Sequence, residues 1–268
     1  MGNNLDIIKI ENLIWKPDEK TVVLKDISID LGSNEFYGIL GPNGAGKTSL
    51  IRQLLMLTSK TSGNISFDEK NIKDISRKEI ALKTSFLAQN INNELNFPVR
   101  EIVAMGREPY RKLFTPLSKA DRDVIEEALE WSGCTDIADK SYAKLSGGEK
   151  RRVMIARVIA QDTPWIILDE PISNLDVRYQ TELMNVFYKL QKEKNKTIIA
   201  VLHDINLAIN YCSKILLMKN GRLELFGDTL DIINEENLQR IYEVPFEFIK
   251  RHNDMKPIVF PKIDIVKK

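Results

Sequence analysis

Short apolar runs separated by charged or turn-forming residues recur along the chain, and such runs are typical of strands. They predict strands over residues 7–10, 22–29, 36–40, 65–68, 86–89, 165–168, 197–202 and 215–218. Apolar positions with a helical period lie between several of these runs. They predict helices over residues 48–57, 118–131, 149–160, 177–193 and 205–211. Strands that alternate with helices favour an α/β fold with a mainly parallel sheet covered on both faces.

The stretch from 90 to 161 departs from this alternation, because its signals are mostly helical. Within it, Ser118 and Asp121 have the spacing of a capping box, which marks the start of a helix that reaches Trp131. We therefore predict a single domain over residues 1–268. Its core lobe is formed by 1–89 and 162–268, and 90–161 form an inserted helical lobe.

Composition narrows the class of protein. The 39 Lys and Arg residues balance 38 Asp and Glu, which gives a net charge of +1. Nucleic-acid binding usually shows as a concentrated basic excess, so we expect no nucleic-acid partner. Cys134 and Cys212 lie far apart and are expected to be reduced, partly buried thiols of a cytoplasmic protein. No signal-peptide pattern and no run of roughly 20 apolar residues is found, so a membrane role is expected to depend on a partner.

A glycine-rich segment with the pattern G-x-x-x-x-G-K-[ST] follows the strand 36–40 and precedes the helix 48–57. Glycines let backbone amides surround a phosphate, and a helix N-terminus adds partial positive charge. Lys47 can contact the β- and γ-phosphates, and the Thr48 hydroxyl can bind Mg²⁺. A chance match in a glycine-rich turn is the alternative, which this context disfavours. The pattern predicts a nucleotide site at Gly41, Pro42, Asn43, Gly44, Ala45, Gly46, Lys47 and Thr48.

Three more polar residues follow strand ends, where α/β folds place their chemistry. Asp169 is predicted to hold Mg²⁺ through water, and Glu170 to polarise the water that attacks the γ-phosphorus. Surface acids without a role are the alternative, which a complete phosphate loop disfavours. His203 is predicted to contact the γ-phosphate, although a lone histidine is more often structural. His252 is interpreted as a surface residue.

The segment Leu145-Ser146-Gly147-Gly148-Glu149, about twenty residues before Leu168-Asp169-Glu170-Pro171, completes a set that resembles the ABC ATPase family. The resemblance runs from Ile7 to about Pro261. It implies the ABC ATPase fold: a P-loop NTPase core, an N-terminal antiparallel β subdomain and an inserted helical subdomain. It also implies ATP hydrolysis coupled to transport, with ATP and Mg²⁺ bound.

The resemblance implies further site residues. Trp15 falls where the family stacks an aromatic ring on adenine, with a core tryptophan as the alternative. Gln89 is expected to reach the metal or the attacking water. The ATP of an opposing subunit is expected to contact the signature segment across a two-fold homodimer that holds two ATP molecules. The further residues that the resemblance implies for ATP binding are Ser49, Ser146, Gly147, Gly148, Glu149 and Asp176. Glu149 occupies a position where glutamine is more common.

The segments Phe97–Val103 and Gly106–Tyr110 are similar to the importer branch for iron-siderophores, haem and cobalamin. Iron-chelate uptake is expected ahead of cobalamin, haem or oxyanions such as molybdate. The implied partners are polytopic permease subunits and, indirectly, an extracytoplasmic binding protein, which would place the chain peripherally on the cytoplasmic face of the membrane. A soluble ABC ATPase of DNA repair or translation would need a coiled-coil insertion or a second ATPase domain. An ATPase of iron–sulfur cluster assembly would lack the 106–110 segment.

The stretch from Gln89 to Tyr110 is expected to couple hydrolysis to transport by receiving a short helix of the permease, as in the family. Ordinary packing within the helical lobe is the alternative. The expectation depends on apolar residues mixed with two polar residues that we expect to face solvent: Phe97, Val99, Ile102 and Met105, with Arg107 and Tyr110.

Overall fold

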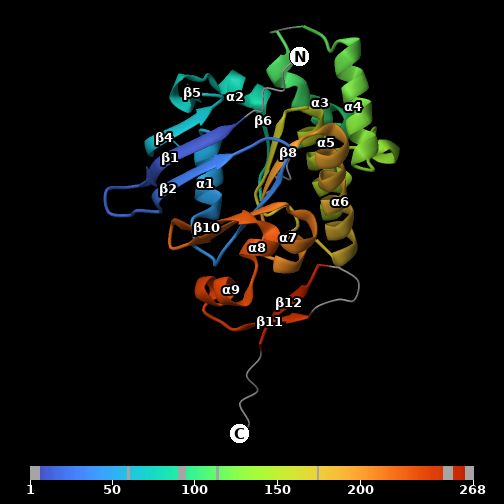
Figure 1. Cartoon of the computed structure of the whole chain (residues 1–268). Helices are drawn as coiled ribbons and strands as arrows, with labels where there is room; N and C mark the ends of the chain where they lie inside the picture. Colours follow the sequence, from blue (N-terminus) through green and yellow to red (C-terminus); the bar gives the residue numbers. More distant parts are fainter. Residues whose placement is uncertain are drawn as a thin grey trace. The chain divides into compact units, whose positions relative to one another are not determined.

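The structure is a computed structural model that describes residues 7–58, 61–89, 95–112, 115–173, 175–249 and 256–262. The chain divides into two compact units, and Figure 1 labels the helices and strands of both. The first unit comprises Met1–Ile72 and Ile199–Lys268, and the second comprises Lys73–Ile198. The chain passes from one unit to the other within a strand, β8 (Thr197–Val201).

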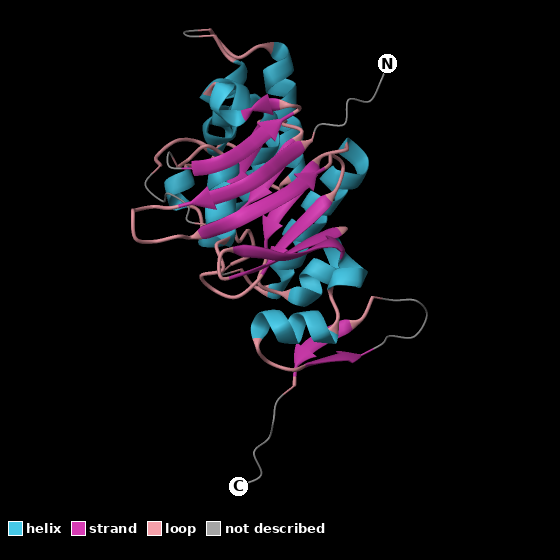
Figure 2. Ribbon diagram, turned by 60° about the vertical axis from the view of Figure 1, so that its left-hand side comes forward, coloured by secondary structure: helices cyan, strands magenta, loops and turns pink. Residues whose placement is uncertain are grey.

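An antiparallel sheet occupies the N-terminal part of the first unit (Figure 2). Its strand order is β2-β1-β4-β5, with β1 (Ile8–Trp15), β2 (Leu24–Leu31), β4 (Thr61–Phe67) and β5 (Lys70–Asn71). Alternate residues of β1 and β2 are buried, because successive side chains of a strand point to opposite faces. This sheet confirms the predicted antiparallel subdomain.

A second group of strands in the first unit surrounds β3 (Phe36–Leu40), which is buried throughout. β3 pairs in parallel with β9 (Lys214–Lys219), and β10 (Arg222–Asp228) adds an antiparallel edge. On the other side of β3 lies β8, next to which the amide of Leu202 donates to the carbonyl of Ile39 at 3.1 Å. The helices of this part are α1 (Lys47–Leu54), α7 (Ile205–Tyr211) and α8 (Thr229–Ile232).

The end of the described chain forms a small C-terminal lobe within the first unit, below α7 and α8 in Figure 1. It consists of α9 (Glu235–Tyr242) and a hairpin of β11 (Phe246–Ile249) and β12 (Ile258–Pro261). Phe246 and Val259 are the buried apolar residues of the hairpin. No element of this lobe was predicted from the sequence.

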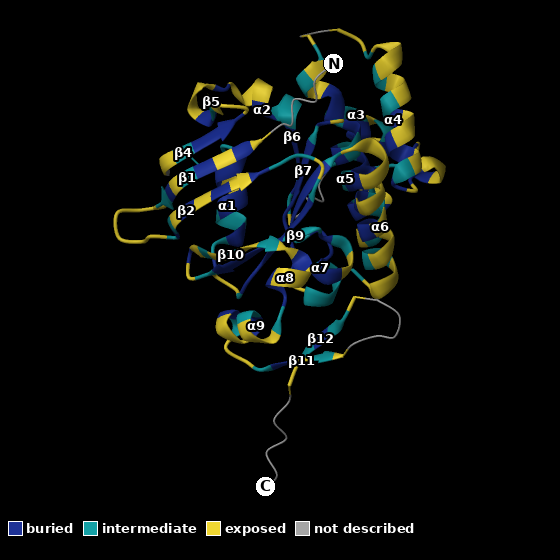
Figure 3. Ribbon diagram, in the orientation of Figure 1, coloured by how far each residue is buried: buried dark blue, intermediate teal, exposed yellow. Residues whose placement is uncertain are grey.

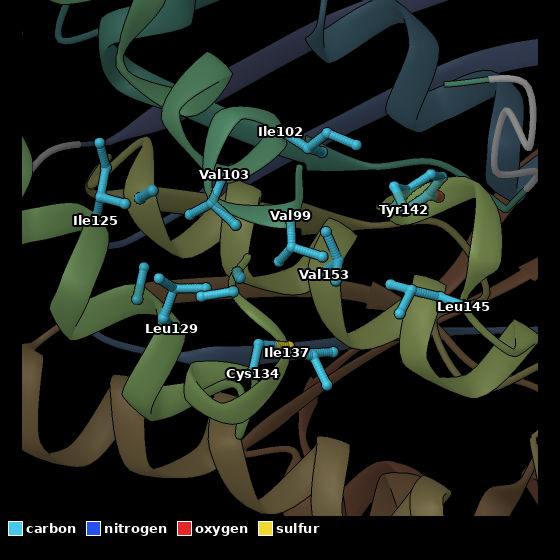
Figure 4. Packing of buried hydrophobic residues seen from close by; sticks show 14 residues of the cluster. Val99, Ile102, Val103, Ile125, Leu129, Cys134, Ile137, Tyr142, Leu145 and Val153 are labelled. Carbon is cyan, nitrogen blue, oxygen red and sulfur yellow. The ribbon is translucent and has the colours of Figure 1, made fainter. Parts of the chain in front are cut away.

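In the second unit, β6 (Thr84–Leu87) and β7 (Trp165–Leu168) pair in parallel. The helices are α2 (Arg77–Lys83), α3 (Val99–Ala104), α4 (Lys119–Trp131), α5 (Gly147–Ala160) and α6 (Val177–Lys194). Helices α3, α4 and α5 enclose a common apolar core, whose residues point toward one another in Figure 4. The outer faces of α4 and α6 are exposed (Figure 3).

The predicted strands and helices through Met218 are confirmed, with ends that shift by a few residues. The capping box of Ser118 and Asp121 is confirmed, and both cysteines are free and buried. The predicted lobe boundaries at 89/90 and 161/162 differ from the bounds of the two compact units and stay a prediction. Asn174 and His252 lie outside the described residues. Within the described part, no helix has the length and apolar character to cross a membrane.

Candidate functional site

The phosphate loop joins β3 to α1, as the sequence predicts. Gly41 (φ 147°) and Gly46 (φ 96°) have backbone conformations that side chains rarely adopt. A Cβ on Gly41 would also lie 2.1 Å from the carbonyl oxygen of Met218, so this position accepts only glycine. By contrast, a Cβ on Gly44 would meet nothing within 4 Å. The loop therefore packs against the sheet on one side and leaves open space at Gly44.

Contacts within the first unit hold this loop in shape. The Lys47 ammonium donates to the carbonyls of Gly41 at 2.7 Å and Pro42 at 2.9 Å, and only 6% of the residue is exposed. The Gly221 amide, in the β9–β10 turn, donates to the Ala45 carbonyl at 3.1 Å. Gly46 is the N-cap of α1, and no side chain caps this helix. The loop thus combines a buried positive charge with a helix N-terminus whose amides are not capped by a side chain.

The other predicted residues of the first unit occupy less enclosed positions. Thr48 and Ser49 lie in the first turn of α1 and are partly buried. Trp15 ends β1 and is also partly buried, unlike Trp165, which lies in the core. His203 is exposed, directly after Leu202 at the end of β8.

In the second unit, two predicted residues meet directly at the ends of β6 and β7. The Gln89 amide donates to the Glu170 carboxylate at 2.7 Å. Glu170 has a positive φ of 47°, an uncommon conformation that is enriched at functional sites. Asp169 precedes it and is buried, with its amide bonded to the Leu87 carbonyl at 2.9 Å. The fold therefore places Gln89 beside the acidic strand end, and its expected contact with the metal or the attacking water stays a prediction.

A buried arginine, which no sequence pattern predicted, bonds to the segments that follow β6 and β7. Arg151 of α5 donates to the carbonyls of Pro171 at 3.0 Å, Ala88 at 2.9 Å, Gln89 at 3.3 Å and Glu170 at 3.2 Å. Burial lowers the pKa of its guanidinium to about 10, so the group stays charged at neutral pH. The adjacent Lys150 and Arg152 give the same charge pattern in sequence, so no local signal singles out Arg151.

The signature segment begins α5. Ser146 is its N-cap and forms a reciprocal capping box with Glu149. The Glu149 carboxylate accepts from the Ser146 amide at 2.8 Å and from its hydroxyl at 2.7 Å. The hydrogen bonds from Ser146 hold the pKa of this carboxyl below its ordinary value. Asp176 has a similar local role, since it caps α6 by accepting from the Tyr179 amide at 3.0 Å.

The expectation that Arg107 faces solvent is wrong. Its residue exposure is 8%, because its guanidinium donates to Asp121 at 2.9 Å and to the Ala160 carbonyl at 2.9 Å. The central carbon of the Arg107 guanidinium lies 3.9 Å from the centroid of the Tyr110 ring, which covers it. Val99 and Ile102 also belong to the helical core rather than to a groove. Among the six residues named for the permease contact, Phe97 and Tyr110 are exposed, at 44% and 40%.

Residues 24–173 match the family profile described as ABC transporter. The chain is 35% identical to the ferric enterobactin transport ATP-binding protein of Escherichia coli (strain K12) over 242 residues, which cover 90% of this chain and 89% of that one. It is 38% identical to the petrobactin import ATP-binding protein of Bacillus subtilis (strain 168) over 223 residues, covering 83% and 88%.

Solved structures give the same result. A metal-chelate type ABC transporter in an inward-facing conformation matches with a TM-score of 0.82 and 25% identity, covering 97% of this chain and 98% of that chain. A bacterial ABC transporter cassette solved as a dimer matches with a TM-score of 0.72 and 29% identity, covering 83% and 98%.

Proposed function

The chain belongs to the ABC transporter family of ATP-binding proteins, and from this premise we propose that it powers the uptake of an iron chelate through a membrane permease. Its two relatives above are named for ferric enterobactin transport and for petrobactin import. The match to a metal-chelate type transporter supports the same substrate class. Cobalamin, haem and molybdate-type oxyanions are the alternative substrates, because the permease and the binding protein, rather than this subunit, contact the substrate.

The first unit supplies the groups that bind ATP. The amides of the phosphate loop and the Lys47 ammonium bind the β- and γ-phosphates, since Lys47 can exchange its loop carbonyls for phosphate oxygens. Trp15 stacks on adenine, and its partly exposed position at the end of β1 leaves ring surface for this. Ser49 adds a hydroxyl to the first turn of α1. His203 contacts the γ-phosphate from the end of β8.

Mg²⁺ fits the residue types present. The Thr48 hydroxyl, the Gln89 side-chain carbonyl and the Asp169 carboxylate each offer an oxygen of the kind that Mg²⁺ prefers, and this ion keeps several waters and binds substrate phosphates. The described residues contain no cluster of three or more His, Cys, Asp or Glu side chains, which agrees with a metal held mainly by nucleotide and water. When bound, Mg²⁺ neutralises charge on the phosphates.

The second unit supplies the groups that act on water. Glu170 takes the proton of the attacking water, and Gln89 orients that water or the metal. The single observation that carries this assignment is the fixed backbone at Glu170. Its carbonyl accepts from Arg151 at 3.2 Å and from the Ser173 hydroxyl at 3.0 Å, and this supports the positive φ. Strain of this kind costs about 1–3 kcal/mol and persists where a side chain must keep one direction.

Two copies of the chain sandwich two ATP molecules, and the match to a dimeric cassette supports this assembly. Ser146, Gly147, Gly148 and Glu149 then face the nucleotide bound by the partner copy, with Asp176 near it. The dimer sits at the cytoplasmic face of the membrane, held by permease subunits that receive substrate from an extracytoplasmic binding protein. Phe97 and Tyr110 are the exposed residues that would contact the permease.

Glu170→Gln tests the function. The variant should bind ATP as the parent does but hydrolyse it roughly 100- to 10,000-fold more slowly, because general-base catalysis is lost. It should also accumulate as an ATP-bound dimer in gel filtration. Glu182→Gln, an exposed acid of α6, is the matched control and should keep the parent rate. Parent-like turnover by the Glu170 variant would contradict the assignment of the base.

A further inference from the structure

The helix α7 begins two residues after His203 and is only seven residues long. Helices this short have little stability of their own, so contacts from other segments must fix their position. At the helix start, Asp204 accepts from the amides of Asn206 at 2.7 Å and Leu207 at 3.1 Å. This cap joins the segment that carries His203 rigidly to the first turn of α7.

The C-terminal lobe holds α7 at both ends. At the start, the Asn206 side chain donates to the Val259 carbonyl at 2.8 Å and accepts from the Val259 amide at 2.8 Å. At the end, the Lys256 ammonium donates to the carbonyls of Ile209 at 2.6 Å and Asn210 at 3.0 Å. Carbonyls in the last turn of a helix lack intrahelical donors, so a cation there is favourable.

The same lobe also reaches the phosphate loop. Lys219, at the end of β9, forms an ion pair with Glu243 at 2.8 Å and donates to the Arg240 carbonyl at 2.6 Å. Two residues further on, Gly221 bonds to the loop at Ala45. The Tyr242 hydroxyl of this lobe is buried near the backbone of Gly41. The lobe therefore contacts the phosphate loop and the helix that follows His203.

His203 lies between two anchors. On one side, the Leu202 amide is bonded to Ile39 of β3, and on the other, Asn206 is bonded to Val259 of the hairpin. Only three residues separate the anchors, so a shift of the second one must move His203. We propose that Asn206 is a positioning residue, through which the β11–β12 hairpin fixes the direction of His203 toward the γ-phosphate. This inference rests on the function proposed above.

The test uses the full-length chain and single-turnover ATP hydrolysis. Asn206→Ala removes both hydrogen bonds to Val259 and should lower the hydrolysis rate roughly 10-fold, because a small misplacement of a catalytic group is costly. The ATP concentration at half-maximal rate should change by less than about twofold, because Asn206 itself does not touch the phosphates. Asn210→Ala is the matched control, the same substitution at an exposed position of α7, and should behave as the parent.

A double substitution separates positioning from a general structural effect. In a His203→Ala background, Asn206→Ala should have no further effect on the rate, since residues that act through one another are not additive. Asn206→Asp can still accept from the Val259 amide but no longer donates to the Val259 carbonyl. Its loss of hydrolysis rate should be about half that of Asn206→Ala on a logarithmic scale. This milder variant decides the question if Asn206→Ala unfolds.

A parent-like rate for Asn206→Ala, or additive effects with His203→Ala, would overturn the inference while the proposed function stands. Absence of ATP hydrolysis by the unsubstituted chain would overturn both.

Discussion

Two helices of this chain, α1 and α5, each begin in a glycine-containing segment of the kind that binds anions. The two differ in what their N-terminal groups bond to. In α1 the N-cap is Gly46, and no side chain caps the helix. In α5 the N-cap is Ser146, whose amide and hydroxyl are both bonded to the Glu149 carboxylate. The first terminus has no side-chain cap, whereas a carboxylate of the same chain lies at the second and offsets its partial positive charge.

The difference teaches that the two sites are prepared differently for phosphate. Bonds within the chain from Lys47 and from the β9–β10 turn hold the phosphate loop in shape. At the signature, the proposed function requires phosphate of the partner's ATP to compete with Glu149 for Ser146. Under the proposed function, binding at α1 is strong in a single chain, and engagement of α5 is weaker and requires the dimer. The three predictions below test this contrast, from the largest effect to the smallest.

Ser146→Arg should have the largest effect. ATP affinity of the single chain should stay within about twofold of the parent, because the phosphate loop is untouched. Hydrolysis should fall at least roughly 100-fold, since the long side chain obstructs the partner's phosphates and a donor is lost. Binding is measured by calorimetry and hydrolysis by phosphate release.

Ser118→Arg is the matched control, because it removes the same type of capping box from α4 of the same unit. It should lose stability comparable to the Ser146 variant and still hydrolyse ATP. If Ser146→Arg hydrolyses at the parent rate, α5 is not a phosphate site.

Lys47→Ala tests the other terminus. It removes a charge-assisted contact to phosphate and the two bonds that brace the loop, so ATP affinity should fall roughly 10- to 100-fold. Arg52→Ala, at an exposed position of the same helix, should bind like the parent. Equal ATP affinity of the Lys47 variant and the parent by calorimetry would show that the loop does not use this charge.

The sequence predicted the parts of the fold that depend on local patterns. The strand, glycine loop and helix around Gly41 and Lys47 are an example. They could be predicted because the pattern that specifies them lies within one short segment of the sequence. The acidic strand end was also found, since β7 is a continuous apolar run.

The contacts that hold these segments were not predictable, because they join residues distant in sequence. Arg151 contacts carbonyls 19 to 63 residues away, and Asn206 pairs with Val259 across 53 residues. Arg107 was misjudged for the same reason: its partners Asp121 and Ala160 are 14 and 53 residues away. A charged residue is assigned to the surface by default, and only tertiary contacts reverse this.

Glu149→Gln should give the smallest effect and makes α5 more like α1. Glutamine can still accept from Ser146 but carries no charge, so ATP-dependent dimerisation in gel filtration should become tighter by roughly two- to threefold, a modest gain because exposed charges are screened. The folded-state pKa of Glu149 is lowered, so its carboxylate stabilises the chain above its ordinary pKa of 4.5 and this contribution is lost as the pH falls through the lowered value. At pH 7 the variant should therefore be less stable by about 0.5 kcal/mol, the order of one capping interaction, and this difference should vanish in acid.

Glu79→Gln alters the equivalent capping box of α2 and is the matched control: it should cost similar stability at pH 7 and leave dimerisation unchanged. If both variants dimerise alike, the carboxylate at the signature does not compete with phosphate, and the two helix termini differ only in local structure.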